Sequence, residues 1–413
     1  MKKTGCMVFL LVALNLYAQD SSFIIKNVRV FDGSLTINET NVVVKNGVIN
    51  GIGPTLKVPD IPNIDGKGFT LVPGFLNAHA HTEYVDQLKE SLRFGVTTVL
   101  DMGTFPEHDK TLRNAAASRK DVADFRSSGI FITPPGGHGT EYGYRIPTIN
   151  NTPDKAKAFV DQRIKLGADY LKIVINGVRN KRNGTPTLDS ATVHALIKAG
   201  HDHKKLVVAH IESTEDIQLA IEAGVDGLVH QWRDSGLRPD LANLIAANNV
   251  FVVAGDVAVI DGFLNGGPQL LLKDKKISPY LSERSIKELK KPMRALPGLS
   301  ITPFMDGLRS LMEADVLLLS GSDAFTGNPR VVHGASYHRM LELFAEAGLP
   351  PARILQMSTS HVADVFDLTD RGRIKPGLIA DLILINGDPT TDIKDTRKIV
   401  KIWRRGIEVN REP

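Results

Sequence analysis

The chain has 413 residues, of which 42% are hydrophobic and 23% are charged, so it can bury a large core and is too long for one small domain. Its 50 Lys and Arg residues are nearly balanced by 46 Asp and Glu residues, which gives a formal net charge of +4. Because this mixed composition contains no long positive run, nucleic-acid binding has little support.

The N-terminal segment, residues 1–18, is predicted to be a cleaved signal peptide. Lys2 and Lys3 precede an apolar run, and the segment closes on the small residue Ala18. The run is shorter than the roughly 20 residues that span a bilayer, and an uncleaved anchor is the alternative. We expect a secreted or periplasmic protein with no membrane span after cleavage, and a homo-oligomer is left open.

Cysteine use limits the chemistry of the mature chain. The single cysteine, Cys6, lies inside the predicted signal peptide. The mature chain therefore has no disulfide, no catalytic thiol and no cysteine ligand for a metal. Any metal must be held by histidine, carboxylate or modified lysine side chains.

Both ends of the mature chain are predicted to be rich in β-strands. Residues 19–70 contain the alternating stretches FIIKNVRVFDG and NVVVKNGVINGIG, which are broken by Asp-Gly and Asn-Gly turns. The same texture returns in residues 366–413, in the stretches LIADLILINGDP and KIVKIWRRGIEV. We expect the two ends to pair into one small composite β-sandwich.

The middle of the chain, residues 71–365, is predicted to be an α/β domain. Short apolar runs alternate with helical patterns: LVPGFLNAHAH, VTTVLDM, GIFIT, DYLKIVI, KLVVAHI, VDGLVH, NVFVVAG and DVLLLSGSD. A doubly wound sheet would show the same alternation, but polar residues gather at the ends of these runs, as they do at the carboxyl ends of barrel strands. The pattern therefore favours a (β/α)8 TIM barrel.

One connection within this domain is unusually long. About 55 residues separate NVFVVAG from DVLLLSGSD, far above the usual loop length. This segment, at about residues 256–308, is interpreted either as a lid over the active site or as an elaboration that only adds packing.

Four histidines and one aspartate are candidate metal ligands. His79 and His81 point to the same side of a strand because side chains at i and i+2 share a face. His210 and His230 end consecutive predicted strands, and Asp323 directly follows another. Taken singly, each histidine could be a core or loop residue and Asp323 could be a helix cap. Their shared position at strand ends favours a metal site.

Lys172 lies within the apolar strand DYLKIVI. A lysine there must reach solvent, pair with a carboxylate or lose its charge, because burying an unpaired ammonium group is very costly. A neutral lysine amine can also add carbon dioxide to form a carbamate, which could bridge two cations.

The motifs VPGFLNAHAH, GVTTVLDMG, GADYLKI, AHIES, GVDGLVH and SGSDA resemble those of the amidohydrolase superfamily over nearly the whole mature chain. The segment GGHG at residues 136–139 resembles its imidazolonepropionase- and prolidase-like branch. The resemblance implies that His79, His81 and Asp323 hold one divalent metal ion and that His210 and His230 hold the other. Carboxylated Lys172 would bridge them. It also implies a barrel with a composite β-sandwich.

The expected activity is metal-dependent hydrolysis of a C–N bond in a small-molecule amide, cyclic amide or Xaa-Pro-like dipeptide. A hydroxide bridging two ions would attack, and Asp323 would transfer the proton as general acid and base. Zinc suits the ligand set, although manganese or iron could occupy it. A lactonase, esterase or phosphotriesterase on the same site is the alternative, and a non-catalytic secreted binding protein is a weaker one.

Three further residues are candidate substrate contacts. His138 in GGHG could contact the substrate or stabilise an oxyanion, although its glycine neighbours could mark only a tight turn. Arg179 and Arg182 could bind a substrate carboxylate or be solvated loop charges. Gln231 and Trp232 stand where this branch commonly has glycine, which leaves the substrate open.

Overall fold

The computed structural model describes residues 21–140, 146–233, 235–292, 298–327 and 330–413. The predicted signal peptide at residues 1–18 lies outside the described residues. Within the described ranges, no helix combines the length and the apolar character that a membrane crossing requires.

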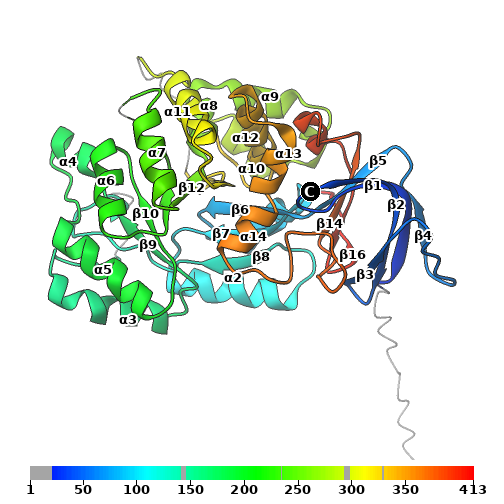
Figure 1. Cartoon of the computed structure of the whole chain (residues 1–413), viewed down its shortest axis with the longest axis horizontal. Coiled ribbons are helices and arrows are strands. Elements are labelled where there is room, and N and C mark those ends of the chain that lie inside the picture. The colour runs from blue at the N-terminus through cyan, green and yellow to red at the C-terminus, as the bar shows by residue number, and fades with distance from the viewer. Residues whose placement is uncertain (1–20, 141–145, 234, 293–297, 328–329) are drawn as a thin grey trace, which may run out of the picture.

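An eight-stranded sheet joins the two ends of the chain (Figure 1). Its path runs in the order β16-β15-β14-β5-β1-β2-β3, and β4 pairs with β1. The N-terminal β5 pairs antiparallel with the C-terminal β14, from Pro73 opposite Leu382 to Phe69 opposite Asn386. The predicted pairing of the two chain ends is therefore confirmed. The strands are β1 (Phe23–Phe31), β2 (Thr36–Lys45), β3 (Val48–Ile52), β4 (Asn63–Asp65), β5 (Phe69–Pro73), β14 (Leu382–Asn386), β15 (Ile399–Arg404) and β16 (Ile407–Glu408).

The middle of the chain contains two parallel sheets, which confirms the predicted α/β class. One has the strand order β6-β7-β8 and the other β13-β12-β11-β10-β9. Isolated parallel bridges join Ala80 to Ala324 and Ile132 to Ile173, so each edge of one sheet touches an edge of the other. The strands are β6 (Phe75–Ala80), β7 (Val96–Asp101), β8 (Asp124–Ser127), β9 (Leu171–Val174), β10 (Val207–His210), β11 (Gly227–Val229), β12 (Phe251–Ala254) and β13 (Leu318–Ser320).

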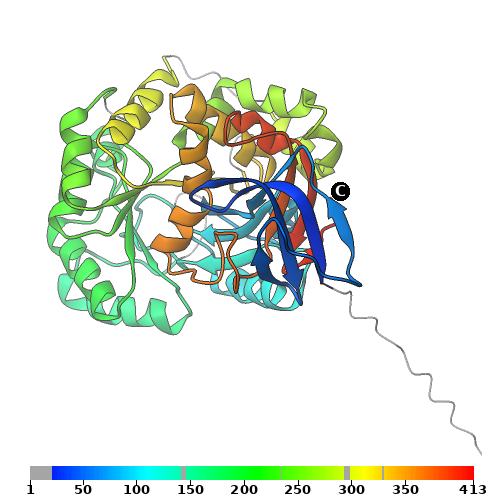
Figure 2. The same ribbon diagram turned by 45° about the vertical axis from the view of Figure 1, so that its right-hand side comes forward.

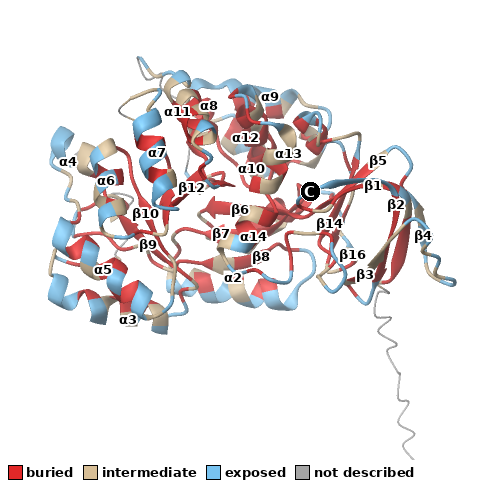
Figure 3. Ribbon diagram, in the orientation of Figure 1, coloured by how far each residue is buried: buried red, intermediate tan, exposed pale blue. Residues whose placement is uncertain are grey.

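Helices surround these parallel strands, and the chain-end sheet lies to one side of them (Figure 2). The strands are almost entirely buried, whereas many helices are exposed on the outward face (Figure 3). The apolar periodicity of the sequence predicts helices with one face toward the core and one toward solvent, as observed. The α-helices are α1 (Val85–Arg93), α2 (Pro106–Ser118), α3 (Ala156–Lys165), α4 (Gly177–Asn183), α5 (Ser190–Asp202), α6 (Thr214–Glu222), α7 (Pro239–Ala247), α8 (Asp256–Leu264), α9 (Gly266–Lys273), α10 (Glu283–Leu289), α11 (Thr302–Glu313), α12 (Ala335–Glu346), α13 (Pro351–Met357) and α14 (Ser360–Val365). Short 3-10 helices lie at η2 (Pro153–Lys155), η3 (Ser278–Tyr280) and η4 (Ile393–Arg397).

The predicted third strand of the middle domain was placed wrongly. The structure has β8 at Asp124–Ser127, and the predicted run GIFIT contributes only the bridge at Ile132. The error has a physical reason, because β8 begins with the charged residue Asp124 and therefore lacks the apolar run that predicts a buried strand. Asp124 accepts a hydrogen bond from the buried guanidinium of Arg371, whose positive charge compensates that of the carboxylate.

The predicted first strand is two strands in the structure, separated at Gly74. A Cβ atom at this position would lie 2.2 Å from Oγ1 of Thr97, so only glycine fits. The chain-end strand β5 stops before this glycine, and β6, which leads to the candidate ligands, begins after it.

The long connection after β12 forms α8, α9, α10 and most of α11. Leu271, Ile277, Leu281 and Leu289 pack in one hydrophobic cluster with Phe94, at the end of α1. Asp261 of α8 forms a 3.2 Å ion pair with Arg339 of α12. These contacts fix the segment against the body of the domain.

Candidate metal centre

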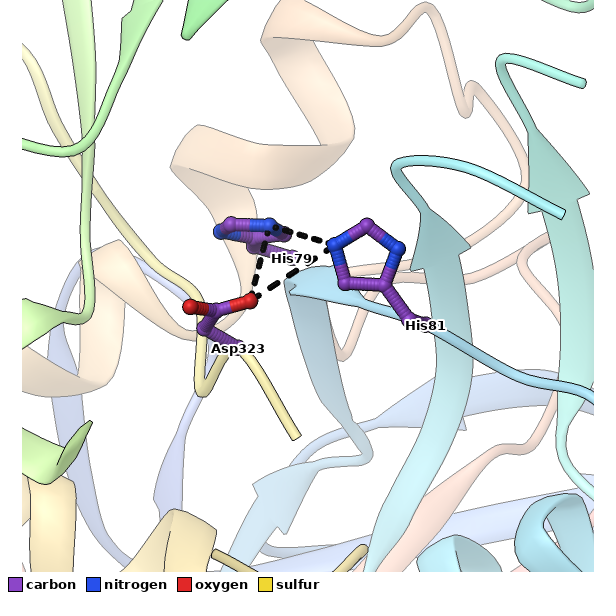
Figure 4. A group of neighbouring side chains, drawn as sticks. All are labelled: His79, His81 and Asp323. Carbon is purple, nitrogen blue, oxygen red and sulfur yellow. Dashed lines mark hydrogen bonds and ion pairs between the residues drawn. The ribbon is translucent and has the colours of Figure 1, made fainter. Parts of the chain in front are cut away.

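Three candidate ligands converge at the carboxyl ends of β6 and β13 (Figure 4). Nε2 of His79 lies 3.3 Å from Nε2 of His81 and 3.2 Å from Oδ1 of Asp323, and Nε2 of His81 lies 3.6 Å from the same oxygen. All three ligand atoms lie within 4.8 Å of one another. The structure therefore brings together the three residues that the family resemblance assigned to one metal ion.

The proton on His81 can be placed from its contacts. Nδ1 lies 3.1 Å from the carbonyl oxygen of Gly103, which can only accept, so Nδ1 donates and Nε2 carries a lone pair. Burial and the nearby Lys172 hold the pKa values of His79 and His81 well below the usual range, so both imidazoles are neutral. Lone-pair atoms that point at one another in a buried site fit a cation between them.

Lys172 completes this side of the site from β9. It is 4% exposed, and its Nζ lies 3.4 Å from Nε2 of His79. Burial lowers the pKa of Lys172 to about 8, although the nearby Asp323 and Asp101 favour its charged form. A buried amine that loses its proton near pH 8 is suited to carbamate formation.

The remaining histidines continue from His79 as a row of neighbouring rings. Ring centroids lie 5.0 Å apart for His79 and His230, 4.6 Å for His230 and His210, and 4.8 Å for His210 and His138. Nε2 of His210 is buried and has no hydrogen-bond partner among the described residues. Burial lowers the pKa of His210 well below its usual value, which leaves a neutral ring suited to metal binding.

Two of the candidate ligands occupy a backbone conformation that side-chain-bearing residues seldom adopt. The φ angle is +79° at His230 and +51° at Asp323. Such left-handed residues cost free energy and concentrate at functional sites, where the surrounding structure holds them. At Asp323 the hydrogen bond from its backbone N–H to the carbonyl of His79 provides this hold.

A buried carboxylate, Asp101 at the end of β7, holds the loops on both sides of His81. It accepts hydrogen bonds from the backbone N–H of Thr82 at 2.5 Å and from that of Gly103 at 2.9 Å. Thr82 follows His81 in the chain, and the carbonyl oxygen of Gly103 accepts the hydrogen bond from Nδ1 of His81. Burial raises the pKa of Asp101 to about 7.

A second carboxylate, Asp256 at the first residue of α8, supports His230. Its Oδ1 lies 3.1 Å from Nδ1 of His230 and 2.7 Å from Nη2 of Arg233. Burial alone would raise the pKa of Asp256, but His230 and Arg233 bring it below the usual range, so it stays ionised. Arg233 also pairs with Glu212 at 3.0 Å, which links the ends of β10, β11 and β12.

Five of the six candidate ligands, all except His79, line a cavity of about 520 Å3. His138, a predicted substrate contact, lines this cavity beside His210. Arg182 is exposed on α4 and does not line the cavity, and the side chain of Arg179 lies outside the described part of the chain. Of the two predicted substrate contacts whose side chains are described, the structure places His138 at the cavity and Arg182 away from it.

Gln231 and Trp232, the two departures after His230, serve packing and not the cavity. Both are buried; Gln231 donates to the carbonyl of Phe304 at 2.7 Å, and Trp232 donates to that of Gly236 at 2.9 Å. The hydrogen bond of Gln231 anchors α11 against the domain. Sequence reasoning missed Asp101, Asp256, Glu212 and Arg233, although Asp101 ends an apolar strand in the same way as Asp323.

The chain was compared with known proteins. Residues 70–409 match the sequence model of the family described as "Amidohydrolase family". The adenine deaminase of Oceanobacillus iheyensis is 23% identical over 396 residues, which cover 92% of this chain and 56% of that protein. A dihydroorotase of Listeria monocytogenes is 27% identical over 116 residues, 25% of this chain and 27% of the dihydroorotase. This chain thus spans about half of the length of the first relative and about a quarter of the second.

A solved structure of a Xaa-Pro dipeptidase with methionine bound in its active site shares the fold. Its TM-score is 0.75 at 21% sequence identity, and the superposition covers 94% of this chain and all of the dipeptidase. At this identity the likeness establishes the fold and leaves the substrate to the residues of the site.

Proposed function

Because the chain belongs to the amidohydrolase family, we propose that it is a metal-dependent enzyme that hydrolyses a carbon–nitrogen bond in a small amide, cyclic amide or Xaa-Pro-like dipeptide. Relatives named as a deaminase, a dihydroorotase and a dipeptidase support this bond type. The observation that carries the proposal is the convergence of His79, His81 and Asp323 within 4.8 Å.

The residues fit two divalent ions. His79, His81 and Asp323 would hold one, His210 and His230 the other, and carbamylated Lys172 would bridge them. Zinc suits this set of nitrogen and oxygen ligands. When bound, divalent ions supply Lewis-acid polarisation of a carbonyl group and make water acidic near neutral pH.

The protein's own groups would bind the substrate and move the proton. Burial raises the pKa of Asp323, so its carboxylate takes up a proton more readily than an exposed aspartate does. Asp323 would accept the proton of the attacking water and return it to the leaving amine. His138, which lines the cavity beside His210, would contact the substrate carbonyl.

We further propose that β6 to β13 close into a (β/α)8 barrel and that the chain-end strands form the accompanying β-sandwich. The bridges at Ala80 and Ile132, at the two junctions between the parallel sheets, support closure. With closure, the carboxyl ends of all eight strands would form one rim around the metal centre.

The proposed function is tested with purified protein, its metal content and a substrate panel. We expect a chelator to abolish hydrolysis of an amide or dipeptide and added Zn2+ or Mn2+ to restore it. Lactones and phosphotriesters in the same panel test the alternative chemistries. Full activity in protein that contains no metal would refute the proposal.

A further inference from the structure

The cavity is lined in part by apolar side chains. Phe105, Phe131, Phe263, Phe325 and Val259 line it and are each only half-buried; we call these five residues the apolar wall. Apolar surface left open to water is costly, and a concave apolar surface beside convergent polar groups is the usual form of a small-molecule site. The apolar wall therefore has the properties of a substrate-binding surface.

The wall begins at the metal centre itself. Phe325 lies two positions after Asp323, and its ring centroid is 6.0 Å from that of His81. The ring of Phe131 sits against Gly103 and Gly139, where added Cβ atoms would lie 2.6 Å and 2.2 Å from it. Because those two glycines leave room for the ring, Phe131 is seated directly beside the loop that holds His81.

The other part of the wall is α8. Val259 and Phe263 are four residues apart, so they share one face of this helix, and both line the cavity. The same helix begins with Asp256, which contacts His230, and is fixed to α12 by the ion pair of Asp261 with Arg339. Val259 and Phe263 are thus carried by a helix that contacts both the metal centre and α12.

We propose that the apolar wall binds an aromatic or branched apolar group of the substrate, so that amides carrying a phenyl-sized group next to the scissile bond are preferred over small ones. The inference rests on the proposed function and specifies its substrate class. Its basis is the presence of four phenylalanine rings in the lining of the cavity that the candidate ligands also line, and the volume of that cavity, about 520 Å3, accommodates such a group.

The experiment uses matched substrate pairs with the metal-loaded enzyme: Phe-Pro against Gly-Pro, and N-benzoyl-L-alanine against N-acetyl-L-alanine. We expect kcat/KM to favour the aromatic member by about 100-fold or more, since one additional methylene group in an apolar pocket changes kcat/KM by about 10- to 200-fold. Phe263→Ala should lower kcat/KM for the aromatic members by about 10-fold and leave the small members unchanged. Leu264→Ala, a neighbour on α8 that is 44% exposed and lies outside the cavity lining, is the matched control.

Binding gives a readout that does not depend on turnover. Calorimetry with the metal-free chain should show that benzamide binds with a negative heat-capacity change and more tightly than acetamide, and that Phe263→Ala weakens benzamide binding. If Phe263→Ala fails to fold, Val259→Ala on the same helix face replaces it.

The outcomes separate the two claims. Hydrolysis of both members of each pair with equal kcat/KM would overturn the apolar-wall inference while leaving the proposed function intact. Hydrolysis of none of the amides by metal-loaded enzyme would overturn the proposed function and the inference with it.

Discussion

Nζ of Lys172 lies 3.4 Å from Nε2 of His79, although the two residues are 93 positions apart and come from different parallel sheets. No local preference of either segment creates this contact. The parallel strands place both side chains at the same end of the domain, where the lysine is buried among neutral imidazoles. The pair is the most direct test of the proposed bridge between two ions.

Replacing this lysine should separate a bridging role from a structural one. We expect Lys172→Ala to fold, to lose one of two bound metal ions and to lose nearly all activity, because the negative charge of the carbamate is gone. Added formate or acetate should restore part of the activity by occupying the vacated space, whereas His79→Ala should show no rescue. Metal analysis and turnover with and without carboxylate give the result. Wild-type metal content and activity would identify Lys172 as an ion-paired lysine only.

Carbamate formation should follow the ionisation of Lys172. Only the neutral amine has the lone pair that adds to carbon dioxide, and its pKa is lowered to about 8. At fixed dissolved carbon dioxide, we expect labelling of the metal-free protein to accelerate about tenfold per pH unit below pH 8 and to level off above it. Carbon-13 NMR with labelled carbon dioxide measures this, with Lys172→Ala as the control. Equal labelling rates at pH 7 and pH 9 would contradict the assigned pKa.

Asp256 should act on metal affinity through His230. Asp256→Asn removes the charge that holds the ring of His230, and we expect a loss of about 10- to 100-fold in metal affinity. The exposed Asp240, which pairs with Arg238 at the surface, provides the control variant Asp240→Asn, which should bind metal as the unmodified chain does. Calorimetric titration of the metal-free proteins compares them. An unchanged affinity in Asp256→Asn would show that the contact does not position His230.

The buried ion pair between Asp124 and Arg371 should stabilise the packing of the C-terminal segment on the parallel strands. Asp124 at the start of β8 accepts from Arg371 and lies near the fully buried Arg404. Asp124→Ala leaves these guanidinium groups without their counter-charge, and we expect the free energy of unfolding to fall by about 3–5 kcal/mol. Urea unfolding measures it, and the activity of the folded fraction should be retained, because Asp124 lies at the opposite end of β8 from the metal centre.

The control for this stability prediction is an exposed ion pair. Asp121 pairs with Arg119 at 2.6 Å, and the two side chains are 53% and 44% exposed. Asp121→Ala should change the free energy of unfolding by less than about 1 kcal/mol, because water screens such pairs. If both variants lose the same stability, the burial of Asp124 does not explain its contribution.

Several features could be predicted from the sequence because they depend on local periodicity. The spacing of His79 and His81 places both rings on one side of a strand, and His210, Lys172 and Asp323 each mark a buried apolar run or its end. The α/β class follows from the same alternation. The run GIFIT led to a wrong placement of the third strand, because the true strand contains Asp124 and Arg126, and the buried charge of Asp124 pairs both with Arg126 and with Arg371, 247 positions away.

Only the tertiary structure decided which groups stand behind the ligands and which surround the substrate space. Asp101 accepts a hydrogen bond from the residue that follows His81. Asp256, in the helix after the next strand, contacts His230. Both contacts depend on how separate loops pack against one another. The same holds for Phe263, whose half-buried ring reads in sequence like any core residue of α8. A sequence determines which side of a strand or helix a residue occupies, because backbone geometry is local, whereas the partner across a cavity is set by how distant segments pack.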